Sequence, residues 1–148
     1  RVLAEFPGLE HALEIVRERR GVRFVNDSKG TNVDATLKAL ESIDQPIWLI
    51  AGGRDKGGDF SRLAPLIRQR VKRLLLIGEA APLIAHAVQG YEAIDRVGSL
   101  HEAIERAAAG ATAGEVVLMS PACASFDMFA DYQDRGRQFK ALVQSLPA

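Results

Sequence analysis

The chain has 148 residues, of which 47% are hydrophobic, and its 19 basic residues balance 19 acidic ones. This length predicts one domain with its own core and leaves little room for a second. A net charge of zero disfavours a nucleic-acid partner, which a basic surface would attract. The only cysteine, Cys123, cannot form an intramolecular disulfide, which favours the cytoplasm over secretion. No apolar run approaches the ~20 residues of a membrane-spanning helix, so membrane insertion is not expected.

The start of the chain allows two interpretations. Residues 9–20 have the spacing of a helix, but LEIVRE, RRG and VRFV also fit an antiparallel hairpin that turns at Gly21. We favour the hairpin. The chain begins with Arg1 rather than methionine, which suggests a piece of a longer protein. We therefore expect a linker remnant at residues 1–5 and the domain at 6–148.

Farther along, short apolar runs alternate with helical patterns. The runs VRFV (22–25), IWLIA (47–51), RLLLIG (73–78) and EVVLMS (115–120) predict buried strands. Apolar residues three and four apart predict amphipathic helices around 33–40, 83–87 and 100–107, and the segment 129–146 is typical of a closing helix. This alternation predicts an α/β, Rossmann-like fold with a mainly parallel sheet and helices on both faces.

Three unusual segments follow predicted strands. They are NDSKGTN (26–32), GGRDKGGDF (52–60) and SPACASFDMF (120–129). Ligands of open α/β sheets bind beyond the carboxyl ends of the strands, so we expect all three segments at one edge of the sheet. Their glycines allow a close approach of backbone to ligand, and their lysines can pair with carboxylate or phosphate. The sequence therefore predicts a site for a small anion.

Each of these features also has a purely structural interpretation. Thr31, three residues before Asp34, fits a helix N-cap, the glycines fit turns, and Asp27 can simply end a strand. Exposed lysines are usually solvated. Cys123 is more typical of a buried thiol than of a nucleophile. The three histidines lack metal-ligand spacing, so no metal site and no catalytic residue is predicted within the chain.

Taken together, the three segments resemble the C-terminal domain of the Mur ligases, in the branch that adds D-glutamate to the peptidoglycan precursor. The resemblance covers nearly the whole chain. It rests on FPGLEH (6–11), GVRFVNDSKGTNVDAT (21–36), LIAGGRDKGGDF (49–60) and LMSPACASFDMFADYQDRGRQF (118–139), which occur in the order and spacing of the family.

The resemblance implies roles for individual residues. Asp27 would face the ribose or adenine of ATP, and Lys29 the phosphates and the incoming glutamate. The remaining implied contacts are all with D-glutamate: Thr31 and Lys56 with its carboxylates, and Ser125, Phe126 and Tyr132 elsewhere on the same substrate. One departure concerns Ala12, where many family members carry an arginine that reaches toward the ATP phosphates.

The implied activity is an ADP-forming ligase reaction of cell-wall synthesis, and hence of cell shape and division. ATP phosphorylates UDP-N-acetylmuramoyl-L-alanine, and D-glutamate attacks the acyl phosphate. The chain has no G-x-x-x-x-G-K-[ST] loop, so ATP and Mg²⁺ would bind mainly to an absent central domain, and the chain would be inactive alone. The alternative is a stand-alone α/β domain that binds or senses a small anion. An encoded P-loop upstream of Arg1 would favour the ligase, and a start codon near Arg1 the alternative.

Overall fold

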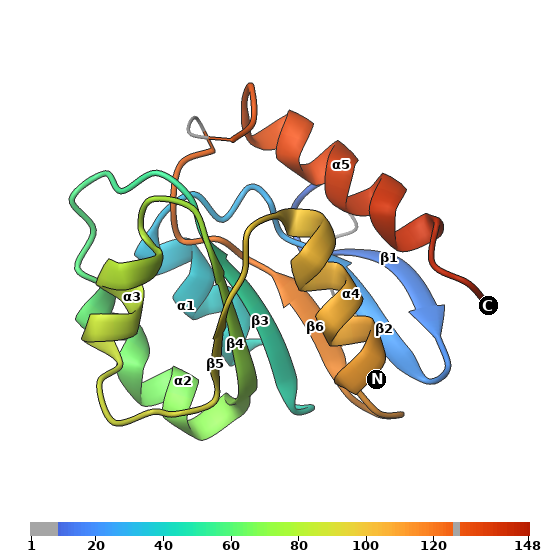
Figure 1. Cartoon of the computed structure of the whole chain (residues 1–148), viewed down its shortest axis with the longest axis horizontal. Helices are drawn as coiled ribbons and strands as arrows, with labels where there is room; N and C mark the ends of the chain where they lie inside the picture. Colours follow the sequence, from blue (N-terminus) through green and yellow to red (C-terminus); the bar gives the residue numbers. More distant parts are fainter. Residues whose placement is uncertain (1–8, 126–127) are drawn as a thin grey trace.

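The computed structural model describes residues 9–125 and 128–148. Within them, six strands form one sheet in the order β1-β2-β6-β3-β4-β5 (Figure 1). The strands are β1 (Glu14–Arg19), β2 (Val22–Asn26), β3 (Ile47–Gly52), β4 (Val71–Ile77), β5 (Ile94–Arg96) and β6 (Val116–Met119). Only β1 and β2 pair antiparallel in this sheet. The predicted α/β class with a mainly parallel sheet is confirmed, whereas the expected linker at 1–5 lies outside the described residues.

The antiparallel part of the sheet is the predicted N-terminal hairpin. Its two turn residues, Arg20 and Gly21, have φ values of 54° and 79°. Two successive left-handed residues are the pattern of a tight hairpin turn whose twist matches that of the strands. The hairpin interpretation is therefore confirmed, and the helix at residues 9–20 is wrong.

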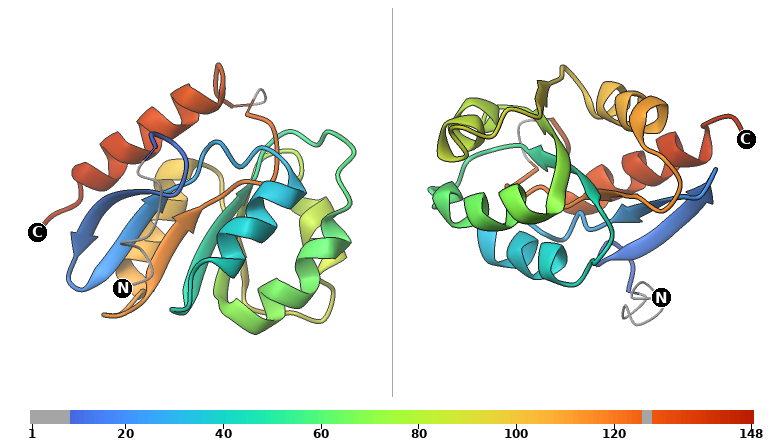
Figure 2. Two further views of the ribbon diagram at one scale, coloured as in Figure 1. Left: turned by 180° about the vertical axis from the view of Figure 1, so that it is seen from behind. Right: turned by 90° about the horizontal axis from the view of Figure 1, so that it is seen from below.

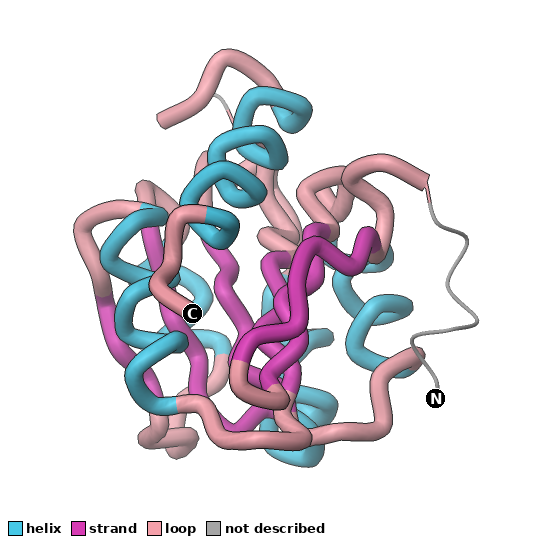
Figure 3. The backbone as a smooth tube through the Cα atoms, turned by 90° about the vertical axis from the view of Figure 1, so that its right-hand side faces the viewer, coloured by secondary structure: helices cyan, strands magenta, loops and turns pink. Residues whose placement is uncertain are grey.

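The parallel strands separate two hydrophobic cores because successive side chains point to opposite faces. On β3, Ile47 and Leu49 belong to one buried cluster, and Trp48 and Ile50 to the other. Figures 2 and 3 show the helices on the two sides of the sheet. The first cluster is covered by α1 (Val33–Glu41), the 3₁₀ turn η2 (Phe60–Leu63), α2 (Ala64–Arg70) and α3 (Ala81–Ala87), and the second by α4 (Leu100–Gly110) and α5 (Tyr132–Gln144).

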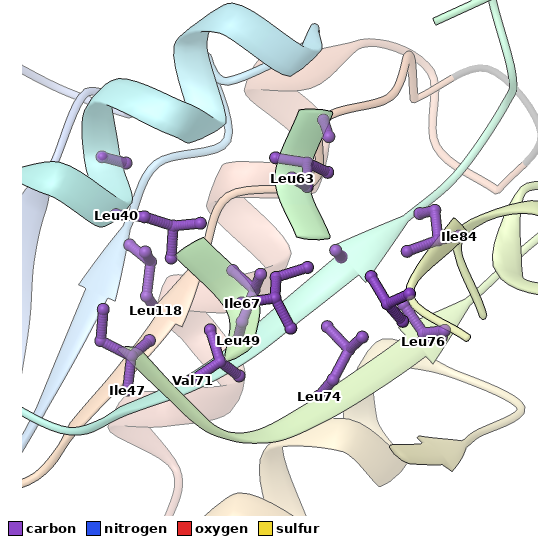
Figure 4. Close-up of a cluster of buried hydrophobic side chains, with 14 of the residues drawn as sticks. Leu40, Ile47, Leu49, Leu63, Ile67, Val71, Leu74, Leu76, Ile84 and Leu118 are labelled. Carbon is purple, nitrogen blue, oxygen red and sulfur yellow. The ribbon is translucent and has the colours of Figure 1, made fainter. Parts of the chain in front are cut away.

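Aliphatic side chains fill the first core. Leu63 and Ile67, from η2 and α2, lie over Leu49 and Leu74 of the central strands (Figure 4), and all four are fully buried. Burying one such side chain stabilises a fold by about 1.5–3 kcal/mol. These contacts hold η2 and α2 against one face of the sheet.

Three elements are absent from the sequence prediction: the 3₁₀ turn η2, helix α2 and strand β5. Strand β5 has three residues, all only partly buried or exposed, so it leaves no continuous apolar run. Helix α2 buries only Ala64 and Ile67 among its seven residues, which is too few for a recognisable helical period. None of the described helices is long and apolar enough to span a bilayer.

The helix caps include one correction. Asn32, not Thr31, caps α1, because its Oδ1 accepts a hydrogen bond of 2.9 Å from the backbone N of Ala35. A capping side chain binds the N–H three residues ahead, and Asn32 is the extended residue next to the first helical one. The N-cap interpretation of Thr31 is therefore wrong by one position.

Candidate functional site

The three loops that follow β2, β3 and β6 meet at one edge of the sheet, as predicted. We call them the first loop (27–32), the second loop (53–59) and the third loop (120–125). Strand β6 lies between β2 and β3, so the third loop lies between the other two. Its Ala122 N donates to Gly30 O of the first loop at 2.9 Å, and its Ala124 exchanges backbone hydrogen bonds with Arg54 of the second. The loops therefore form one connected unit.

One hollow at this edge joins residues from all three loops. Its volume is about 230 Å³, and it contains Thr31 and Lys56. We call it the Thr31 hollow, and its lining is Thr31, Asn32, Val33, Asp34, Lys56, Gly58, Asp59, Arg62 and Ala122. Lys56 is exposed and has no ion-pair partner among the described residues, whereas Arg62 is paired with Asp34 at 2.6 Å. Among the described residues, the hollow is thus lined by an exposed ammonium group that makes no ion pair.

A second hollow, of about 300 Å³, brings together Asp27 and Lys29. We call it the Asp27 hollow, and its lining is Ala12, Leu13, Asp27, Lys29, Gly30, Ala35, Lys38 and Ala39. Its walls are mostly small apolar side chains, while two exposed lysines provide positive charge. Such a surface suits a flat, weakly polar group next to an anionic one.

Asp27 is the most unusual acid of the site. It is 7% exposed, and burial raises its pKa to about 6, because desolvation disfavours the carboxylate more than its partners favour it. Those partners are the hydroxyl of Ser120, which donates at 2.7 Å, and the backbone N of Leu13, which donates at 3.1 Å. The Ser120 hydroxyl also lies 3.0 Å from that of Thr36, so the carboxyl group ends a buried chain of hydroxyls.

Two of the remaining predicted residues can be placed in the structure, and neither lines these hollows. Ser125 is buried in the third loop, and Phe126 lies outside the described residues. Tyr132 is partly buried at the start of α5, where its ring meets that of His11 edge to face at 6.1 Å. The structure thus groups Thr31 with Lys56 and Asp27 with Lys29, but neither Ser125 nor Tyr132 lines the two hollows.

Sequence reasoning missed Arg135. This side chain is 1% exposed and donates hydrogen bonds to both the first and the third loop. One signal was present in the sequence: Arg135 lies four residues before the buried Phe139, so it occupies the inward face of an amphipathic helix. A charged residue at such a position needs buried partners.

A larger hollow, of about 450 Å³, lies at the opposite edge of the sheet, where β3 and β4 begin. Its cations already have partners within the protein. The Arg70 guanidinium donates to Ile43 O at 2.8 Å, near the end of α1, and the Lys72 ammonium is paired with Glu115. The carboxyl edge is therefore the better candidate site.

Comparison with known proteins identifies the family. Residues 13–123 match the family described as "Mur ligase, glutamate ligase domain". The chain belongs to the Mur ligase family. Among its curated relatives is the UDP-N-acetylmuramoylalanine–D-glutamate ligase of Caldicellulosiruptor saccharolyticus, which is 52% identical over 148 residues. That match covers 99% of this chain and 33% of the relative, so this Mur ligase chain spans about a third of the length of the curated relatives it matches.

Solved structures share the fold at lower identity. A murein peptide ligase from Psychrobacter arcticus aligns over 98% of this chain and 32% of its own, with a TM-score of 0.63 and 15% identity. A bifunctional folylpolyglutamate synthase/dihydrofolate synthase from Yersinia pestis, solved with AMPPNP and a manganese ion, aligns over 91% of this chain and 32% of its own, with a TM-score of 0.62 and 16% identity. The resemblance to Mur ligases seen in the sequence is confirmed.

Proposed function

We propose that this Mur ligase chain is the D-glutamate-positioning part of a larger cytoplasmic enzyme that adds D-glutamate to UDP-N-acetylmuramoyl-L-alanine in peptidoglycan synthesis. In the first step, ATP transfers its terminal phosphoryl group to the substrate carboxylate, giving an acyl phosphate and ADP. In the second step, the amine of D-glutamate attacks the acyl carbon, the amide forms, and phosphate and a proton leave.

The observation that carries this proposal is the shared hollow of Thr31 and Lys56. The two residues come from different loops, and together they offer a hydroxyl and an ammonium group that has no ion-pair partner in the described part of the chain. That combination suits a carboxylate, because charge-assisted hydrogen bonds to ammonium groups are about twice as strong as neutral ones. D-glutamate presents two carboxylates in addition to the attacking amine.

The neighbouring Asp27 hollow supports a nucleotide next to the amino acid. Its small apolar walls suit a base or ribose, and Lys29 suits the phosphates. The contribution of these loops to the rate is positional, since holding the amine and the acyl phosphate in line can supply several kcal/mol. We propose the remaining contacts with D-glutamate for Ser125, Phe126 and Tyr132.

Magnesium is expected wherever ATP is the phosphoryl donor. The described residues contain no group of three or more His, Cys, Asp or Glu side chains that could hold a metal ion. We therefore assign no step on this chain to a metal, and we propose that the rest of the parent protein holds Mg²⁺ and most of the ATP.

The test is a reciprocal pair of lysine variants in the full-length parent protein. Lys56→Ala removes a charge partner of D-glutamate and should raise the KM for D-glutamate about 10- to 100-fold, while the KM for ATP stays near wild type. Lys29→Ala should act mainly on kcat/KM for ATP, with a loss on the order of 100-fold. Each variant is the control for the other, because both remove one exposed ammonium group.

A third variant, Thr31→Ala, checks the hydroxyl. Since Asn32 caps α1, this change leaves the helix cap in place, and we expect a higher KM for D-glutamate with little loss of stability. Wild-type D-glutamate kinetics in both Lys56→Ala and Thr31→Ala would refute the assignment of the hollow.

A further inference from the structure

Arg135 is the least exposed charged side chain among the described residues, with 1% of its surface accessible. It lies in the first turn of α5 and makes hydrogen bonds to the first and third loops. Its Nη2 donates to Ser28 O at 2.8 Å, its Nε to Ser28 Oγ at 3.0 Å, and its Nη1 to Cys123 O at 3.1 Å. One guanidinium therefore joins the first loop to the third.

The second loop approaches the same guanidinium. A methyl group added to Gly53 would lie 3.5 Å from Arg135 Nη1 and 2.5 Å from Ala124 O. The missing side chain at Gly53 thus lets the second loop pass close to the arginine and the third loop. All three loops that form the site converge on one side chain.

Ser28 also ties the first loop back to the start of α5. Its hydroxyl accepts from Arg135 Nε and donates to Tyr132 O at 2.6 Å, so both the first loop and the start of α5 use it. The planar guanidinium of Arg135 donates to the carbonyl and the hydroxyl oxygen of Ser28 at the same time. The single ammonium group of a lysine cannot make both hydrogen bonds in this geometry.

The next residue, Gly136, leaves space for His11, which also supports the first loop. A methyl group there would lie 2.1 Å from His11 Nδ1, so only glycine leaves room for the His11 ring against α5. That ring nitrogen lies 2.9 Å from Asn26 Nδ2, and His11 O accepts a hydrogen bond of 2.9 Å from Lys29 N. His11 holds this place with a left-handed φ of 65°, a conformation that persists only when its surroundings enforce it.

We propose that Arg135 and Gly136 form a positioning element that sets the mutual geometry of the three ligand-facing loops. The inference rests on the function proposed for those loops. Arg135 donates hydrogen bonds to both Ser28 and Cys123. Gly136 leaves space for His11, whose carbonyl oxygen binds the backbone N of Lys29. The pair is thus placed to control the nucleotide and the glutamate contacts together, whereas Lys56 is assigned to D-glutamate alone.

The alternative is that Arg135 only stabilises the fold, and kinetics of the full-length protein separate the two cases. Arg135→Lys keeps the charge but loses the fork, and it should lower kcat/KM for both ATP and D-glutamate by about 100-fold, the scale of an ångström-sized misplacement. Arg137→Lys is the matched control, because Arg137 is exposed two residues farther on, and it should behave as wild type. Phe139→Leu, a change in the core face of the same helix, should lower the melting temperature without changing either KM.

Two further variants keep the inference testable if Arg135→Lys does not fold. Ser28→Ala removes the hydroxyl but leaves the two carbonyl contacts, and it should lower both kcat/KM values by about tenfold. Gly136→Ala displaces His11 and should affect ATP more than D-glutamate, because His11 holds Lys29. Unchanged kinetics in Ser28→Ala, or an Arg135→Lys enzyme that behaves like Phe139→Leu, would overturn the proposal.

Hydrogen exchange distinguishes failure of this inference from failure of the proposed function. In the substrate-free parent protein, Arg135→Lys should speed amide exchange at Lys29 and Ala122, whose N–H groups hold the first loop to its neighbours. Arg137→Lys should not. If the wild type lacks D-glutamate-dependent ATP turnover, the proposed function fails, and this exchange difference still supports the positioning role. Equal exchange in the two variants would refute that role.

Discussion

Asp27→Asn isolates the energetic effect of one buried carboxyl group. Burial raises the pKa of Asp27 from 3.8 to about 6. The folded chain therefore holds a proton at Asp27 that the unfolded chain has already lost, over the window between about pH 4 and pH 6. Within that window, the free energy of unfolding contributed by this group falls as the pH rises, and above the folded pKa its stabilising contribution is gone.

The raised pKa sets the size of the effect. A change from 3.8 to about 6 corresponds to about 3 kcal/mol. Asparagine has the same shape and no charge, so its oxygen can still accept from Leu13 N, while its amide donates to the Ser120 hydroxyl, which can turn toward Thr36. We therefore expect the stability of the wild type relative to the variant to fall by about 2–3 kcal/mol between about pH 4 and pH 7.

The assay is urea unfolding across this pH range, followed by the fluorescence of the single, buried Trp48. Asp44→Asn is a suitable control, because that side chain is 73% exposed and its ion pair with Arg70 is long, at 3.9 Å. The control should follow the wild-type curve. Stability curves of the wild type and Asp27→Asn that run parallel from pH 4 to pH 7 would refute the account of Asp27.

Three further outcomes follow from the structure. The isolated 148-residue chain should unfold cooperatively because it has its own core, yet release no phosphate with ATP, UDP-N-acetylmuramoyl-L-alanine and D-glutamate; measurable turnover would contradict the proposed division of labour. Gly52→Ala should cost about 3 kcal/mol or more of unfolding free energy, because its methyl group would lie 2.0 Å from Ile77 O. Gly57→Ala, with open space around it, should cost only about 1 kcal/mol, and equal costs would show that the backbone of β4 yields. Ala12→Arg in the parent protein should change the KM for ATP by less than about threefold, because Lys29 and Lys38 already line that hollow; a large gain in ATP affinity would reveal a weakened nucleotide site.

The sequence alone determined the class of the fold and the edge at which the site lies. Apolar runs such as IWLIA and VRFV are local patterns, and burial on both faces of a sheet dictates their composition. Gly21 favoured a hairpin turn there, but the φ values of Arg20 and Gly21 in the structure decided against the helix. Because parallel strands share one carboxyl edge, the three polar segments could be placed together before their contacts were known.

The same local reasoning failed for a strand that is too short to show a pattern, and for the choice between two adjacent residues as a helix cap. Strand β5 has only three residues, without a buried run. The cap of α1 could have been Thr31 or Asn32, and only the extended backbone of Asn32 next to the helix decides between them. Such alternatives differ by about a kcal/mol, which tertiary contacts readily override.

Only the tertiary structure decided which loop residues share a hollow and what holds them. The position of β6 between β2 and β3 puts the third loop in the middle, and no local period encodes that order. The bond from Arg135 to Ser28 joins residues 107 positions apart. A buried cation must find its acceptors wherever the fold brings carbonyl and hydroxyl oxygens to it, because leaving it without them would cost several kcal/mol. Sequence patterns therefore specify the elements of this domain, whereas long-range hydrogen bonding of buried polar groups specifies the geometry of its site.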